Sequence, residues 1–115
     1  MFDRDISQVN NWMNMFRWVV KLIRDEYGID EAKLSRHASI EAEIGLSTEQ
    51  IEEVLDITSK CFGITFPDGT LDEIVKFEEF CMLAAWSNGL YKQPEFISTA
   101  FAAKVSAANP RAQAG

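Results

Sequence analysis

Glycines divide this chain into segments whose apolar residues recur at helical spacing. Gly28, Gly63 and the pair Asn88-Gly89 each follow such a segment, and Gly45 breaks the chain again between the first two. Glycine is favoured just after the last turn of a helix because it adopts the left-handed conformation without steric cost. The one short alternating run, Ile64-Thr65-Phe66, is too brief to indicate a sheet. The spacing therefore predicts an all-α protein, a small helix bundle.

The first two long helices are predicted from their caps and apolar stripes. Ser7 is a suitable N-cap for the first, which Gly28 ends. Its predicted inward face holds Val9, Trp12, Phe16, Val19, Val20, Ile23 and Tyr27. Ser47 or Thr48 begins the second, which Gly63 ends. Its predicted inward face holds Ile51, Val54, Leu55, Ile57 (in part), Thr58 and Phe62.

Shorter elements are predicted around the second helix. Residues 29–44 are expected to form a long loop with one helical turn near 30–34. After Gly63 we expect a connecting loop, then a short third helix starting at Asp68 or Thr70. A fourth helix follows through residues 77–86 and stops at Asn88-Gly89.

Residues 90–109 are predicted to form a C-terminal helical extension that packs on the bundle of residues 1–89. Pro94 suits the first turn of this fifth helix. Its apolar stripe comprises Phe96, Ile97, Ala100, Phe101 and Val105. The tail, residues 110–115, is expected to be disordered.

The first helix carries more large apolar residues than one face can bury, namely Trp12, Met13, Met15 and Trp18. We expect the fifth helix to cover this surplus. A sticky interaction face is the alternative.

Charge and composition exclude several functions. A single domain of 115 residues with net charge −7 lacks the clustered lysines and arginines that bind a phosphate backbone. An acidic protein of this size is expected to meet basic patches on partner proteins. The chain has no apolar run long enough for a membrane span and no visible signal peptide, so we expect a cytoplasmic monomer.

No constellation of side chains indicates an enzyme or a metal site. His37 is the only histidine and is expected to lie in a loop, exposed or packed there. Cys61 and Cys81 are too few for a metal site or a disulfide framework, and we expect reduced core cysteines.

The second predicted helix is strongly acidic. Glu49, Glu52, Glu53 and Asp56 recur along it at spacings of three and four residues. A charge run is usually a solvated face. It can also be a docking surface for enzymes with a basic groove.

Several short motifs, at gap-free spacing, resemble the acyl carrier protein family. They are Tyr27-Gly28-Ile29, Leu34-Ser35, Ala38-Ser39-Ile40, Glu43-Ile44-Gly45 and Phe62-Gly63-Ile64-Thr65-Phe66-Pro67-Asp68. Glu53, Val54, Ile74 and Phe77 also fall on positions that the family fills with similar residues. The similarity covers about residues 16–86.

The resemblance implies a four-helix bundle whose second helix is the recognition helix. It also implies a serine at the start of that helix bearing 4′-phosphopantetheine. In register, this serine falls on Thr48, with Ser47 in the place of the family's Asp and Glu49 in that of its Leu. A one-residue loop deletion would instead make Ser47 the attachment residue. Both residues are equally explained as helix caps.

Two functions remain open. One is a carrier, with the acidic face of Glu49, Glu52, Glu53 and Asp56 docking basic partner enzymes of fatty-acid, polyketide or related acyl-transfer metabolism. The other is an unmodified protein-interaction or regulatory module that keeps the carrier fold without the arm.

Overall fold

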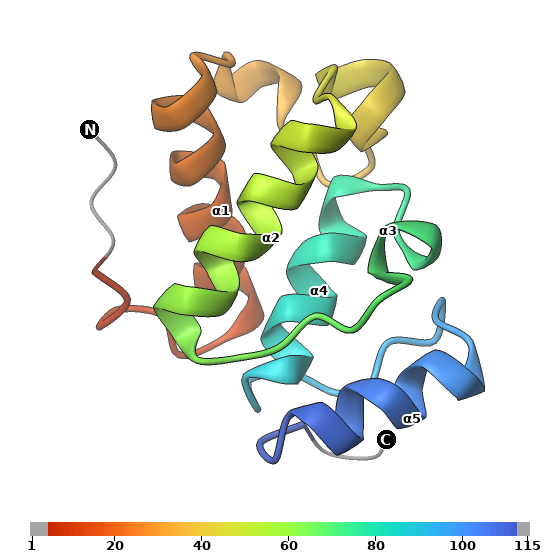
Figure 1. The fold of residues 1–115 in the computed structure, drawn as a ribbon. Helices are drawn as coiled ribbons and strands as arrows, with labels where there is room; N and C mark the ends of the chain where they lie inside the picture. Colours follow the sequence, from red (N-terminus) through yellow and green to blue (C-terminus); the bar gives the residue numbers. More distant parts are fainter. Residues whose placement is uncertain (1–4, 113–115) are drawn as a thin grey trace.

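The computed structural model describes residues 5–112, and its regular elements are helices joined by turns and loops (Figure 1). It contains α1 (Trp12–Tyr27), a 3₁₀ turn η1 (Glu31–Lys33), a π turn η2 (Ile40–Ile44), α2 (Thr48–Phe62), α3 (Thr70–Glu73), α4 (Phe77–Ser87) and α5 (Thr99–Ala108). Within residues 5–112 there is no strand, only one isolated bridge between Ser39 and Lys76. The predicted all-α class is confirmed.

The first helix begins later than predicted. Asn11, not Ser7, is its N-cap, and the Asn11 side chain accepts the backbone N–H of Asn14 at 2.9 Å. The backbone N–H and hydroxyl of Ser7 instead both donate to the carboxylate of Asp5. Asn11 was not predicted, because the exact terminal residue of a helix is poorly defined by an apolar pattern alone.

The buried face of α1 is rotated relative to the predicted stripe. It consists of Met15, Trp18, Val19, Leu22 and Ile23. Trp18 packs edge-on against Phe62 of α2, with ring centroids 4.8 Å apart. This face turns inward because α1 borders both α2 and α4, so it buries a wider arc than a single stripe (Figure 1).

The apolar surplus of α1 is largely buried. Met15 and Trp18 lie in the same core cluster as Phe101 and Val105 of α5. Trp12 packs against Tyr91 at 5.8 Å between ring centroids, and the Arg36 guanidinium lies 5.0 Å from the centre of its ring. Met13 stays partly exposed.

The segment between α1 and α2 is more ordered than the predicted loop. The turn near 30–34 appears as η1, but sequence analysis missed η2. In η2, Ile40 and Ile44 are buried, and the Ser39 hydroxyl accepts the backbone N–H of Ala42. The spacing of residues 40–44 does not predict this element, because π turns are rare and this one is only five residues long.

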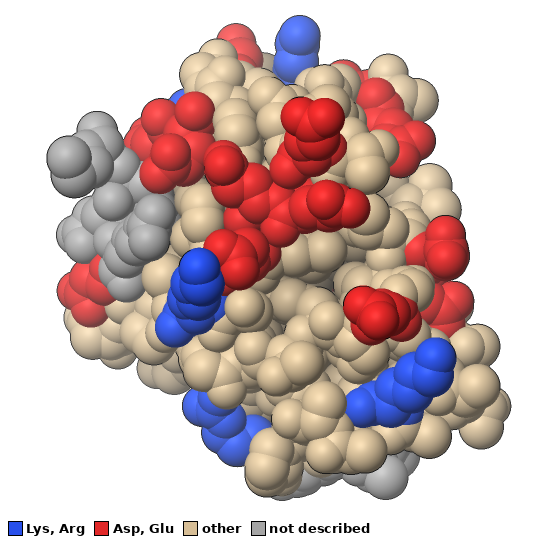
Figure 2. All heavy atoms as spheres, viewed as in Figure 1, with Lys and Arg blue, Asp and Glu red and all other residues tan. Residues whose placement is uncertain are grey.

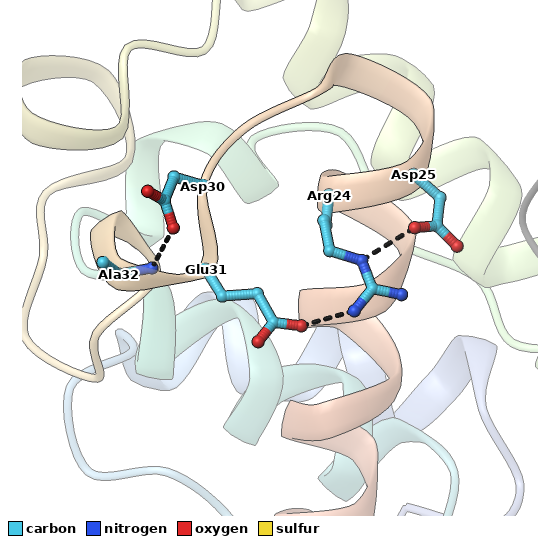
Figure 3. Close-up of polar contacts among 5 residues, drawn as sticks. All are labelled: Arg24, Asp25, Asp30, Glu31 and Ala32. Carbon is cyan, nitrogen blue, oxygen red and sulfur yellow. Dashed lines mark hydrogen bonds and ion pairs between the residues drawn. The ribbon is translucent and has the colours of Figure 1, made fainter.

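Charged side chains join the end of α1 to η1 (Figure 3). Arg24 lies between two carboxylates, with Nε 2.8 Å from Asp25 and Nη1 2.5 Å from Glu31. The Asp30 carboxylate accepts the backbone N–H of Ala32 at 3.0 Å and so caps η1. The hydrogen bond from Arg24 is the main cause that lowers the pKa of Asp25.

The fifth helix starts at Thr99, not near Pro94. The Ser98 hydroxyl accepts the backbone N–H of Phe101 and caps the helix. Pro94 is buried ahead of a turn at residues 95–96. The helix is therefore shorter than predicted, but most of the stripe is buried: Ile97, Phe101 and Val105 are in the core, Phe96 is half-buried and Ala100 is exposed.

The described part of the tail is held against the bundle, whereas residues 110–115 were expected to be disordered. The Arg111 guanidinium donates to the carbonyl oxygens of Phe62 and Gly63 at 2.6 and 3.1 Å. The chain passes so close to Gly89 that a Cβ atom there would lie 2.9 Å from the Arg111 carbonyl oxygen. Residues 113–115 of the predicted tail lie outside the described residues.

Candidate functional site

The start of α2 is closed by a capping box. The Ser47 hydroxyl accepts the backbone N–H of Gln50 at 3.1 Å, and the Gln50 side chain accepts the backbone N–H of Ser47 at 3.0 Å. Two otherwise unpaired donors of the helix end are thereby satisfied. Ser47 thus has a structural role that accounts for its presence.

Thr48 is the first helical residue and differs from its neighbour. Its side chain is exposed, and no group among the described residues hydrogen-bonds to its hydroxyl. The preceding residue, Leu46, is buried and anchors the turn. Of the two predicted attachment residues, Thr48 therefore has the hydroxyl that is available for chemistry, at a helix N-terminus that favours a phosphate group.

The acidic residues of α2 lie together on its outer face. Glu49, Glu52, Glu53 and Asp56 are all exposed. Their spacing places them on one stripe, opposite the buried Ile51, Val54 and Thr58. Figure 2 shows acidic side chains gathered over α2 and continuing toward α3.

Two of the four carboxylates already have partners. Asp56 forms an ion pair with Lys60 one turn later, at 3.0 Å. Glu53 accepts a hydrogen bond from the Tyr27 hydroxyl of α1. Burial first, then the hydrogen bond to Glu53, raises the pKa of Tyr27. No such partner is found for Glu49 or Glu52 within residues 5–112, so these two carboxylates are exposed and unpaired.

A groove runs between α2 and the segment that leads into α3. Its volume is about 590 Å³. The α2 side contributes Glu52, Leu55, Asp56 and Ser59, and the other side is formed by residues 64–72. The sequence pattern does not predict this groove, because its two walls meet only in the folded chain. The Pro67-Asp68-Gly69 turn was the nearest signal.

A smaller apolar opening lies near the first turn of α2. Its volume is about 170 Å³, and Ile51 and Ile74 are among its lining residues. Val75 at its edge is 62% exposed, unusual for a large apolar side chain beside a core. The same two isoleucines border a narrow gap inside the core.

The other candidate side chains form no catalytic set. His37 is exposed, with Nδ1 3.4 Å from a Glu78 carboxylate oxygen. Cys81 is fully buried, and burial raises the pKa of its thiol, whereas Cys61 is half-buried. Among residues 5–112, no three histidine, cysteine or acidic side chains are placed to hold a metal ion.

The chain has no significant match among protein-family models, curated proteins or solved structures. The acyl carrier resemblance therefore stays a prediction from the residue pattern. No helix in the described part of the chain is long and apolar enough to cross a membrane.

Proposed function

We propose that this protein is an acyl-carrier-like protein that docks basic enzymes of fatty-acid, polyketide or related acyl-transfer metabolism through the outer face of α2. The observation that carries the proposal is the stripe of exposed carboxylates that begins directly after the exposed hydroxyl of Thr48. A basic partner would be steered to this stripe by charge and would meet the hydroxyl at its end.

In the carrier form of the proposal, Thr48 bears 4′-phosphopantetheine. The free hydroxyl at the first position of α2 supports Thr48 over Ser47, whose hydroxyl closes the capping box. The helix N-terminus would stabilise the phosphodiester. When attached, the phosphopantetheine arm would carry an acyl group as a thioester.

In the second form, the protein is an unmodified interaction or regulatory module with the same docking face. The capping box favours this form because it explains Ser47 without any attachment. Glu49 also favours it, since an acidic side chain stands where the family has an aliphatic residue.

Intact mass spectrometry after incubation with coenzyme A and a phosphopantetheinyl transferase separates the two forms. The carrier form predicts a mass increase of one phosphopantetheine group, retained in Ser47→Ala and lost in Thr48→Ala. A mass that stays unchanged with several transferases would eliminate the carrier form and leave the interaction module. A gain lost in Ser47→Ala instead would place the arm on Ser47.

A further inference from the structure

Glycine follows an aspartate or an asparagine at two places in this chain, Asp68-Gly69 and Asn88-Gly89. In such a pair the backbone nitrogen of the glycine can attack the side-chain carbonyl carbon of the residue before it, because glycine has no Cβ atom to obstruct the approach. The product is a five-membered succinimide ring. Both pairs are therefore candidate sites of a spontaneous covalent modification, and the fold holds them in different ways.

The reaction needs no cofactor and no oxidant. At Asp68 a bond forms between the Gly69 nitrogen and the side-chain Cγ atom, while the nitrogen's proton and the hydroxyl of the protonated carboxyl group leave as water. At Asn88 the Gly89 nitrogen forms the same bond, and ammonia leaves. Water then adds to one of the two ring carbonyls and one ring C–N bond breaks. Addition at the former backbone carbonyl yields isoaspartate, in which the chain continues through the side-chain carbonyl.

The Asn88-Gly89 pair is held closed. The backbone N–H of Gly89 donates to the carbonyl oxygen of Trp86 at 2.9 Å, so the nitrogen that would attack is fixed by the last turn of α4. The Asn88 side-chain oxygen is buried. The backbone of Arg111 also covers Gly89, because a Cβ atom there would lie 2.9 Å from the Arg111 carbonyl oxygen. The ring can form only after these contacts open.

The Asp68-Gly69 pair lies in an open turn. The backbone N–H of Thr70 donates to the carbonyl oxygen of Pro67 at 3.2 Å, and Gly69 takes the left-handed position of the turn, with φ 94°. Asp68 and Gly69 are both exposed, and a Cβ atom at Gly69 would meet no atom within 4 Å. Within residues 5–112 no group accepts a hydrogen bond from the Gly69 N–H. The attacking nitrogen is thus free at this pair.

We propose that the fold makes Asp68, and not Asn88, the residue at which the native chain forms succinimide and isoaspartate. The proposal is independent of the docking function above. Isoaspartate adds one carbon atom to the backbone of the turn between α2 and α3, so the modification lengthens one wall of the groove. Asn88 reacts only in molecules in which the end of α4 has opened.

The test is peptide mapping of the full chain after prolonged warm incubation, in native buffer and in concentrated urea. Chromatographic retention separates isoaspartyl from aspartyl peptides, and mass spectrometry detects the conversion of the Asn88 amide to an acid. We expect isoaspartate at residue 68 in both conditions. Deamidation of Asn88 should be at least about tenfold slower in native buffer than in urea, because it requires local opening.

The variant Asp68→Asn provides the matched comparison. Both sites then carry an asparagine before a glycine and lose ammonia, so the leaving group no longer distinguishes them. In native buffer, position 68 of this variant should deamidate at least about tenfold faster than Asn88 in the same molecule. The two rates should approach each other in urea. Thermal unfolding confirms that the variant is folded.

Two outcomes overturn the proposal. Equal native rates at the two sites of Asp68→Asn would show that the end of α4 does not protect Asn88. Isoaspartate at residue 68 that forms only in urea, or in neither condition, would show that the open turn does not admit the reaction.

Discussion

Ser47 and Thr48 are adjacent hydroxyl residues with different roles. The Ser47 hydroxyl is the acceptor that closes the capping box, and the Thr48 hydroxyl has no partner among the described residues. The Ser47 hydroxyl thus caps the helix, whereas the Thr48 hydroxyl is left exposed. A sequence pattern alone assigns both to the helix end and cannot separate them.

This division predicts unequal losses of stability. Ser47→Ala should lower the free energy of unfolding by about 1 kcal/mol, because the N–H of Gln50 loses its acceptor. Thr48→Ala should change it by less than about 0.5 kcal/mol, as is usual for an exposed residue without such a contact. Urea denaturation measures both. Equal losses would show that the two hydroxyls do not differ in this way.

The two cysteines are predicted to differ in reactivity. Cys81 is fully buried and its thiol pKa is raised by that burial, so its nucleophilic thiolate form is scarce. Cys61 is half-buried near the end of α2. A thiol reagent added to the native protein should label Cys61 first and Cys81 only on unfolding. Labelling of both at one rate, read by mass spectrometry with Cys61→Ser as the control, would contradict this burial pattern.

At the scale of elements, α5 is attached through polar contacts at both of its ends. Asn109 is buried and satisfies both backbone groups of Thr65. Ser98 binds Glu73 just past α3. The helix thereby fixes the segment that forms one wall of the groove, although no residue of α5 lines it.

Removal of the Asn109 side chain should therefore loosen the wall of the groove that contains Thr65. Asn109→Ala should cost about 2 kcal/mol, because the partly buried N–H and carbonyl of Thr65 lose their partners. Hydrogen exchange should quicken at Thr65. The exposed Asn10 provides a matched control, and Asn10→Ala should cost less than about 0.5 kcal/mol. Unchanged exchange at Thr65 in Asn109→Ala would disprove the anchoring role.

The contact between Glu73 and Ser98 predicts a dependence on pH. Hydrogen bonds from the Ser98 hydroxyl and N–H lower the pKa of Glu73 below its ordinary value of 4.5. A lowered pKa in the folded state means that the contact stabilises the fold fully above pH 4.5 and is lost as the pH falls through the lower value. The stability difference between the wild type and Glu73→Gln should shrink below pH 4.5. A difference that stays constant down to pH 2.5 would exclude this linkage.

At the scale of the whole molecule, local signals predicted the fold better than the site. The stops at Gly28, Gly63 and Asn88-Gly89 were correct because glycine and asparagine act through nearby backbone geometry. The inward face of α2 was also largely correct. The inward face of α1 was correct only in part: Val19 and Ile23 are buried, whereas Met15, Trp18 and Leu22 were not predicted, since which side of a helix is most buried depends on the partners that pack against it.

The groove and the anchors of α5 could not be predicted for the same reason. Asn109 and Thr65 are 44 residues apart, and no short pattern links them. Predicting the acidic stripe needed only the spacing of Glu49, Glu52, Glu53 and Asp56. The structure adds that Asp56 and Glu53 are already engaged, by Lys60 and Tyr27.

Docking of basic partner enzymes on the outer face of α2 is tested most directly by an NMR titration of the ¹⁵N-labelled protein with a phosphopantetheinyl transferase and, separately, with a ketosynthase. We expect at least one of these enzymes to bind with shifts centred on residues 47–56. This binding should weaken as salt shortens the screening length and fall further in the triple variant Glu49→Gln, Glu52→Gln, Glu53→Gln. Shifts centred on α1 or α5, binding unaffected by the triple variant, or no binding by either enzyme would contradict it.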